Sequence, residues 1–169
     1  MEERYVIRDM TPEHCDSKGY VHYKSWQETY RGLLDDRILD RQTLENCQIR
    51  ANRYLQNTLV LLDRNRRDRV VGFACYIAEA RDFFSVSGAS EVMAIYLLEQ
   101  YKGLGLGRRL MEACLERLPH PSVVLLVLEG NTRAIGFYEH MGFRLTGHRR
   151  TERISGAEMT ELEMLLQRG

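Results

Sequence analysis

Apolar positions recur at two periods along this chain, and the change from one period to the other separates predicted strands from predicted helices. Continuous or alternating apolar runs predict strands at residues 5–7, 58–62, 70–80, 91–97, 123–128, 143–149 and 158–166. Spacings of three and four predict helices after Thr11 and Thr43, after the glycines at 103–107, and after Asn131. This order predicts an α+β fold in one domain, residues 1–169, with one strand–helix–strand crossover between residues 91 and 128.

The helix predicted at residues 43–55 has its apolar residues on one face. These residues are Leu44, Cys47, Ala51, Tyr54 and Leu55. We therefore expect this face to be buried against the sheet.

A glycine-rich run follows the predicted strand 91–97 and precedes a predicted helix. It reads Gln100, Tyr101, Lys102, Gly103, Leu104, Gly105, Leu106, Gly107, Arg108, Arg109. Alternating glycines let the backbone approach a ligand closely and adopt positive φ. The first N–H groups of a helix, together with its dipole, favour an anion. The run therefore predicts a site for a phosphorylated cofactor, although glycines that merely ease a tight turn remain an alternative.

Two other phosphate-binding motifs are excluded at this run. The dinucleotide fingerprint requires glycine where Arg108 stands, and no Gly-Lys-Ser/Thr follows as in nucleoside triphosphatases. A nucleotide-binding protein is therefore the least favoured interpretation.

A second cluster, residues 131–143, follows the apolar strand 123–128. Ala134, Phe137, Tyr138 and Met141 share one face of a short helix. Asn131 is placed to cap its N-terminus, and Gly142 to end it. From the pattern alone, a capped helix with a buried stripe explains these residues as well as a functional site does.

Together the two clusters resemble the GNAT superfamily of acyl-CoA N-acyltransferases. The family motif Q/R-x-x-G-x-G/A is matched by Gln100, Gly103 and Gly105. The later motif N-x-x-A-x-x-F-Y-x-x-x-G-F is matched by Asn131, Ala134, Phe137, Tyr138, Gly142 and Phe143. The resemblance implies a mixed, mostly antiparallel central sheet with helices on both faces and a parallel strand–helix–strand unit that binds the cofactor.

The resemblance also implies acetyl-CoA as the cofactor and assigns roles to residues. Backbone amides of the glycine run would bind the diphosphate, Asn131 would help to hold the pantetheine arm, and Tyr138 would protonate the departing thiolate. The expected cofactor-binding set is Leu97, Gln100, Lys102, Gly103, Leu104, Gly105, Leu106, Gly107, Arg108, Asn131 and Tyr138.

Acetyl transfer to an amine needs a base for the amine, a donor for the oxyanion and an acid for the thiolate. Leu97, at the strand end, is the expected backbone donor. Glu91, at the head of the same strand, is the candidate base, and a solvent-facing charge is the alternative. The five histidines show no partner pattern, and we expect them at the surface.

The resemblance implies that the acceptor site lies under the first two helices and the loop that joins them. Trp26, Glu28 and Tyr30 are the candidate substrate-binding residues, because aromatic rings and a carboxylate can hold a cationic amine. Trp26 and Tyr30 also fit a plain core role. The acceptor is thus predicted only as a small-molecule or peptide amine.

Composition narrows the remaining classes of function. Twenty-four Lys and Arg balance twenty-four Asp and Glu, so the net charge argues for neither nucleic acid nor membrane. Four widely spaced cysteines show no metal-ligand spacing, so no metal is expected. Residues 1–4 lack the apolar core of a leader peptide, so a cytoplasmic setting is expected. A homodimer is left open.

Two hypotheses follow from these observations. The first is an acetyl-CoA-dependent N-acetyltransferase, and the second is a non-catalytic acyl-CoA-binding module with the same fold. Retention of Tyr138 favours the enzyme, because pantetheine binding does not require a phenol.

Overall fold

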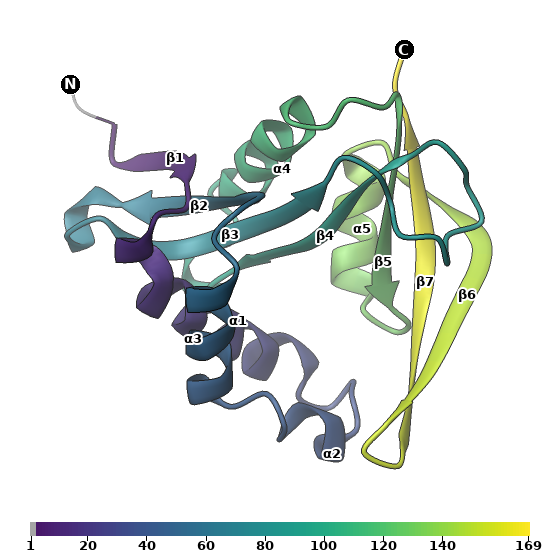
Figure 1. The fold of residues 1–169 in the computed structure, drawn as a ribbon, viewed down its shortest axis with the longest axis horizontal. Coiled ribbons are helices and arrows are strands. Elements are labelled where there is room, and N and C mark those ends of the chain that lie inside the picture. The colour runs from purple at the N-terminus through teal and green to yellow at the C-terminus, as the bar shows by residue number, and fades with distance from the viewer. Residues whose placement is uncertain (1–2) are drawn as a thin grey trace.

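The computed structural model describes residues 3–169. Seven strands form one sheet in the order β1-β2-β3-β4-β5-β7-β6 (Figure 1). The strands are β1 Tyr5–Asp9, β2 Thr58–Asp63, β3 Arg69–Ile77, β4 Ser90–Leu97, β5 Ser122–Leu128, β6 Arg144–Ile154 and β7 Ala157–Gln167. Every neighbouring pair is antiparallel except β4 and β5, which are parallel. The predicted α+β fold with a mixed, mostly antiparallel sheet is confirmed.

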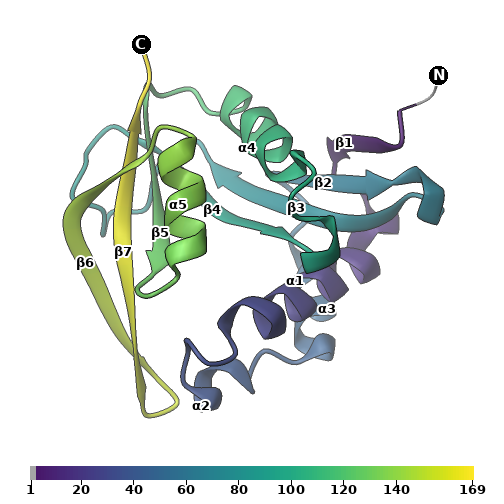
Figure 2. The ribbon, with the colours of Figure 1, turned by 180° about the vertical axis from the view of Figure 1, so that it is seen from behind.

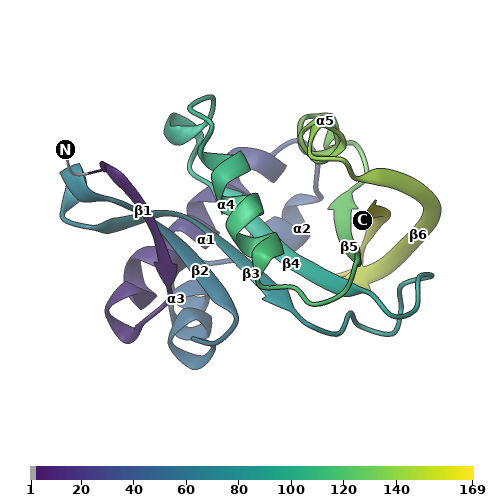
Figure 3. The ribbon, with the colours of Figure 1, turned by 90° about the horizontal axis from the view of Figure 1, so that it is seen from above.

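Helices cover both faces of the sheet. They are α1 Cys15–Tyr30, α2 Asp36–Leu39, α3 Leu44–Arg53, α4 Leu106–Glu116 and α5 Thr132–His140. Helices α1 and α3 lie on one face, and α4 and α5 lie on the other (Figure 3). Within residues 3–169, no helix is long and apolar enough to cross a membrane.

Two expectations about burial are wrong. On α3, Cys47 and Ala51 are buried as predicted, but Leu44 is 37% exposed and Tyr54 is 60% exposed, because the helix packs along a narrower stripe. Two of the five histidines, His14 and His22, are buried. His14 accepts a hydrogen bond from the Thr11 backbone N–H, and His22 packs among aromatic rings, so tertiary contacts hold both inside.

The parallel pair of strands is short. Only Ser90 with Val123 and Glu91 with Val124 are paired between β4 and β5. Beyond these residues the two strands diverge, β4 running to the glycine turn and β5 running to α5 (Figure 2). The carboxyl ends of β4 and β5 therefore do not pair with each other, and the sheet is open between them.

Helix α2 and the residues on either side of it contact the tip of the β6–β7 hairpin. Arg41 Nη1 donates to Ser155 Oγ at 3.0 Å, and an apolar cluster lies beside this contact. Its buried members are Leu34, Ile38, Leu128 and Ala157. The hairpin turn is tight because Ser155 and Gly156 both have positive φ, 53° and 79°.

Candidate active site

A cleft of about 1060 Å³ lies where β4 and β5 separate. Both strands line it, together with the glycine turn, α5 and the last turns of α1. One side is formed by α4 and α5, and the other by α1 and by residues of β6 and β7. The cleft therefore has two distinct walls that meet at the diverging strands.

The glycine turn leaves its amides free. Gly103 and Gly105 have φ of +79° and +77°, and a Cβ added at either would meet no atom within 4 Å. Gly105 is the N-cap of α4 and has no side-chain cap, and the first backbone bond of the helix is from Arg109 N to Gly105 O. Among the described residues, the N–H groups of residues 103–108 have no acceptor. Free amides at a helix start fit a diphosphate.

The structure divides the expected cofactor-binding residues into two groups. The larger group lines the cleft: Leu97, Lys102, Gly103, Gly105, Gly107, Arg108, Asn131 and Tyr138. Gln100 and Leu104 are exposed and are not among the cleft residues, and Leu106 is buried in the core. The side chains of these last three residues therefore do not line the cleft.

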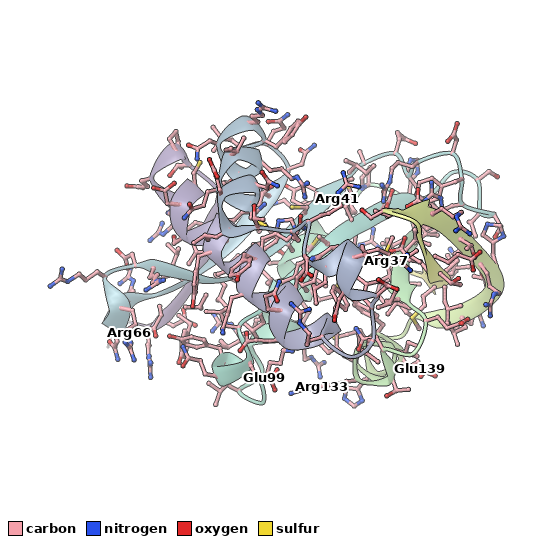
Figure 4. The ribbon with its side chains drawn as sticks, turned by 90° about the horizontal axis from the view of Figure 1, so that it is seen from below. Arg37, Arg41, Arg66, Glu99, Arg133 and Glu139 are labelled. Atoms are coloured by element: carbon pink, nitrogen blue, oxygen red, sulfur yellow. The ribbon has the colours of Figure 1, made fainter. Side chains whose placement is uncertain are left out.

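Cations surround the glycine turn. Glu99 forms ion pairs with Lys102, at 3.0 Å, and with Arg133 of α5, at 2.6 Å. Both cations lower the pKa of the Glu99 carboxyl, and Arg133 has the larger effect. Figure 4 shows Glu99 and Arg133 close together, one from the turn after β4 and one from α5. Arg108 pairs with Glu112 at 2.8 Å. These exposed pairs leave basic groups within reach of phosphates.

Helix α5 begins as the sequence predicts. Asn131 Oδ1 accepts a hydrogen bond from the Ala134 backbone N–H at 3.2 Å, and Gly142 follows the helix with φ of +102°. The Asn131 amide nitrogen makes no hydrogen bond to any described residue, although the side chain is only 7% exposed. Asn131 therefore caps the helix with its oxygen and keeps a donor in the cleft.

Tyr138 lies on the cleft side of α5. Its ring packs edge-on against Phe143, with centroids 6.0 Å apart, and its hydroxyl has no hydrogen bond to a described residue. Burial raises the pKa of this phenol, with a smaller contribution from Tyr30. The hydroxyl is therefore protonated at neutral pH and free to donate.

The amide of Leu97 points into the gap between the strands. Leu98 N donates to Val71 O at 3.0 Å, and Leu97 is opposite Gly72 in the antiparallel pair. Amides alternate in direction along a strand, so the Leu97 N–H points away from β3. Strand β5 has already diverged at this point. The Leu97 N–H is thus an unpaired donor at the cleft.

Glu91 has a different environment from that expected. Its side chain is buried, and both carboxylate oxygens accept hydrogen bonds from Arg81 Nε, at 3.0 and 3.2 Å. The Arg81 backbone N–H also donates to it, at 3.2 Å. Glu91 is not among the cleft residues, whereas Arg81 is. The carboxylate is therefore neither a solvent-facing charge nor open to the cleft.

The other wall of the cleft carries aromatic residues. Trp26 and Tyr30 pack edge-on, 5.0 Å apart, and the Tyr30 hydroxyl lies 3.2 Å from that of Tyr96 on β4. Glu28 is exposed at the rim, where it accepts a hydrogen bond from the Glu99 N–H at 3.4 Å. Trp26 and Tyr30 therefore do both things that the sequence left open: they pack on a core cluster and line the cleft.

Sequence reasoning missed several cleft residues on β4, β6 and β7. The missed residues are Tyr96, Arg150, Glu152 and Glu161. The available signal was the two glutamates, Glu161 and Glu163, in a strand that is central rather than at an edge. A charged residue on a central strand must face a partner or a cavity.

Comparison with known proteins places this geometry in a family. A profile described as "Acetyltransferase (GNAT) family" matches residues 19–143. The chain belongs to the GNAT family of acetyltransferases. It is 26% identical over 151 residues to a probable N-acetyltransferase of Mycobacterium tuberculosis, covering 83% of this chain and 80% of that protein.

Two further similarities concern particular GNAT proteins. The peptidyl-lysine N-acetyltransferase YjaB of Escherichia coli is 32% identical over 83 residues, which is 49% of this chain and 48% of that protein. The PaiA N-acetyltransferase of Thermoplasma acidophilum, solved in complex with coenzyme A, superposes with a TM-score of 0.66 at 18% identity, over 99% of each chain. The latter shows a shared fold.

Membership of the GNAT family makes acetyl-CoA the cofactor of this chain. The free amides of residues 103–108 and the flanking cations fit its diphosphate. The protein is therefore an acetyltransferase.

Proposed function

We propose that this protein transfers an acetyl group from acetyl-CoA to a primary amine by direct attack in a ternary complex. One observation carries the proposal: the unpaired Tyr138 hydroxyl lines the same cleft as the free amides of the glycine turn. A module that only binds the cofactor needs the amides but not the phenol.

The wall that α4, α5 and the glycine turn form, called the cofactor wall, binds acetyl-CoA and orients it. The amides of residues 103–108 receive the diphosphate, with Lys102 and Arg108 beside it, and the free amide nitrogen of Asn131 donates to the pantetheine arm. When bound, the cofactor supplies an activated acetyl thioester. The diverging strands allow the arm to lie between β4 and β5, where strand-edge groups would otherwise be unpaired.

Two donors of this chain act on the reacting thioester, one on its carbonyl oxygen and one on its sulfur. The Leu97 N–H donates to the carbonyl oxygen of the acetyl group as negative charge develops there. Tyr138 donates its proton to the sulfur as the C–S bond breaks. Its raised pKa keeps the phenol protonated until that step.

The base role of Glu91 stays a prediction, and the geometry disfavours it. Its carboxylate is occupied by Arg81 and is not among the cleft residues. Water or another cleft residue must then accept the proton of the amine.

The acceptor enters against the wall opposite the cofactor. Trp26, Glu28 and Tyr30 line this side and suit a cationic amine. This side of the cleft admits a small-molecule amine or the amine of a peptide. The four cysteines are free, which supports the proposed cytoplasmic setting.

The alternative is a non-catalytic acyl-CoA-binding module. The test is thiol release from acetyl-CoA, followed over time with a panel of amino acids, polyamines and short peptides, with an amine-free reaction as control. Amine-dependent release supports the enzyme. Tight coenzyme A binding by calorimetry with no amine-dependent release would favour the binding module.

A further inference from the structure

Four charged side chains from the loop before β4, from β6 and from β7 line the acceptor end of the cleft, and three of them, Arg81, Arg150 and Glu152, are held in ion pairs. Arg81 binds Glu91, and Arg150 binds Glu152 at 2.5 Å. Both guanidinium groups also stack on Phe83, with Cζ 4.7 and 4.1 Å from the ring centroid. The remaining charge is Glu161, which has no hydrogen bond or ion pair to any described residue.

The position of Glu161 follows from strand register. On β7 it lies opposite Leu128 of β5 and opposite Arg150 of β6. Glu163, two residues along and so on the same face, bonds to Ser85 in the loop before β4. This face is therefore the one away from α4 and α5, on the acceptor side of the sheet.

The charge of Glu161 lies near two aromatic residues that line the cleft, Tyr30 and Tyr96. It is close enough to Tyr30 and Tyr96 to raise the pKa of both phenols, although burial contributes more. Tyr138 in turn raises the pKa of Tyr96. Glu161, on β7, and Tyr138, on α5, thus both lie near the Tyr30–Tyr96 pair.

We propose that Glu161 binds the ammonium group of the acceptor and accepts its proton, a catalytic role in the proposed acetyl transfer. The inference rests on the proposed function and adds the missing base. An unpaired carboxylate on this wall of the cleft also favours a cationic amine over an anionic acceptor.

The electrostatic surroundings suit this role. Burial, then Glu152 and more weakly Glu91, raise the pKa of Glu161, whereas Arg150 and Arg81 lower it. The phenols of Tyr30 on α1 and Tyr96 on β4 complete the charged or titratable groups that face it. A carboxyl with a raised pKa is a stronger base than an ordinary one, and it still ionises when a cation binds.

The step balances as follows. The ammonium gives one proton to Glu161, and the freed lone pair forms the C–N bond as the C–S bond breaks. Tyr138 protonates the sulfur. The second proton shed by the nitrogen restores the Tyr138 phenol, and Glu161 releases its proton to water.

The test is Glu161→Gln, which keeps the shape of the side chain and removes the base. We expect kcat/KM near neutral pH to fall by about 10²-fold or more, with coenzyme A affinity unchanged by calorimetry. The variant should recover activity as pH rises toward the pKa of the amine, because only free amine can then react. Glu161→Asp should retain part of the activity.

The melting temperature separates this role from a structural one. Ionised Glu161 has no partner, so its raised pKa means that it stabilises the fold less as pH rises through that pKa. Glu161→Gln should therefore melt no lower than wild type at neutral pH. Glu158→Gln, at an exposed position on the same strand, is the matched control and should behave as wild type.

The outcomes distinguish this inference from the proposed function. An active wild type with a Glu161→Gln variant within about twofold of it at every pH from about 5.5 to about 9 would overturn the base assignment alone. A wild type that acetylates no amine would overturn both. Loss of rate with recovery at high pH and an undiminished melting temperature supports Glu161.

Discussion

Arg81 binds the carboxylate of Glu91 through both its side chain and its backbone. Nε lies 3.0 and 3.2 Å from the two oxygens, and the backbone N–H lies 3.2 Å from one of them. Glu91 is fully buried, whereas the Arg81 side chain is 43% exposed. The pair fixes the loop before β4 against the point where β4 and β5 begin to diverge.

This pair predicts that Glu91 acts on stability. Glu91→Gln weakens charge-assisted hydrogen bonds to Arg81, which costs on the order of 2 kcal/mol, or roughly 5 °C in melting temperature. The shape of the pH–rate profile should not change. Thermal melts and kcat/KM across pH measure both effects.

Arg81→Gln is the matched variant, because it breaks the same pair from the other side. The double variant should melt close to either single one, since the shared contact is lost only once. A Glu91→Gln profile that loses its acidic limb would instead restore Glu91 as the base.

A substitution in the glycine turn should lower the affinity for coenzyme A, and a control variant separates this loss from the effect of backbone strain on stability. Gly105→Ala places a methyl group at φ of +77°, in the open space of the cleft where the diphosphate is expected. Gly88→Ala, at φ of +67° with equally open surroundings, is a control outside the cleft. Both should lose about 1 kcal/mol of stability. Only Gly105→Ala should weaken coenzyme A binding in calorimetry, and equal affinities in the two variants would refute the assignment.

Tyr138 predicts a loss of turnover without a loss of stability. Tyr138→Phe removes a hydroxyl that has no partner among the described residues, so the packing against Phe143 is kept. Loss of a general acid typically lowers kcat by about 10²–10⁴-fold. Tyr20→Phe removes a phenol outside the cleft and should leave kcat unchanged. If Tyr138→Phe keeps its kcat and melts lower, the residue is structural.

Because His22 is buried, we expect the stability of the fold to fall at acidic pH. Burial, with the nearby cations of Lys18 and Arg50, lowers the pKa of His22 to about 3. A base with a depressed pKa is protonated first in the unfolded chain, so stability falls as pH drops below the unfolded value of about 6.5. His22→Phe should reduce the fall in melting temperature between about pH 7 and about pH 4. Equal falls in both proteins would argue against this origin.

The starts of α4 and α5 and the end of α5 could be predicted from the sequence, because each depends on a short motif. The N-cap at Asn131, the stop at Gly142 and the helix start at the glycine run depend on residues a few positions apart, and all three are confirmed. Such features are encoded by backbone chemistry that neighbours determine.

The acceptor wall could not be predicted in the same way. Glu161 lines the cleft because β7 pairs with both β5 and β6, and Glu91 is buried because Arg81 folds back from a loop. These placements depend on strand order and loop path, which the periodicity of a single strand does not contain. The burial of His22 likewise depends on rings from two other segments, Phe73 of β3 and Tyr96 of β4.

The most direct measurement follows the acetyl group itself. The protein is incubated with acetyl-CoA labelled with carbon-13 in the acetyl group and with a cationic amine, and the amine is analysed by mass spectrometry. We predict a labelled N-acetyl product whose amount rises with time and enzyme concentration, and which nearly vanishes for Tyr138→Phe. Unmodified amines across the whole panel, from a protein that still binds coenzyme A, would contradict the account.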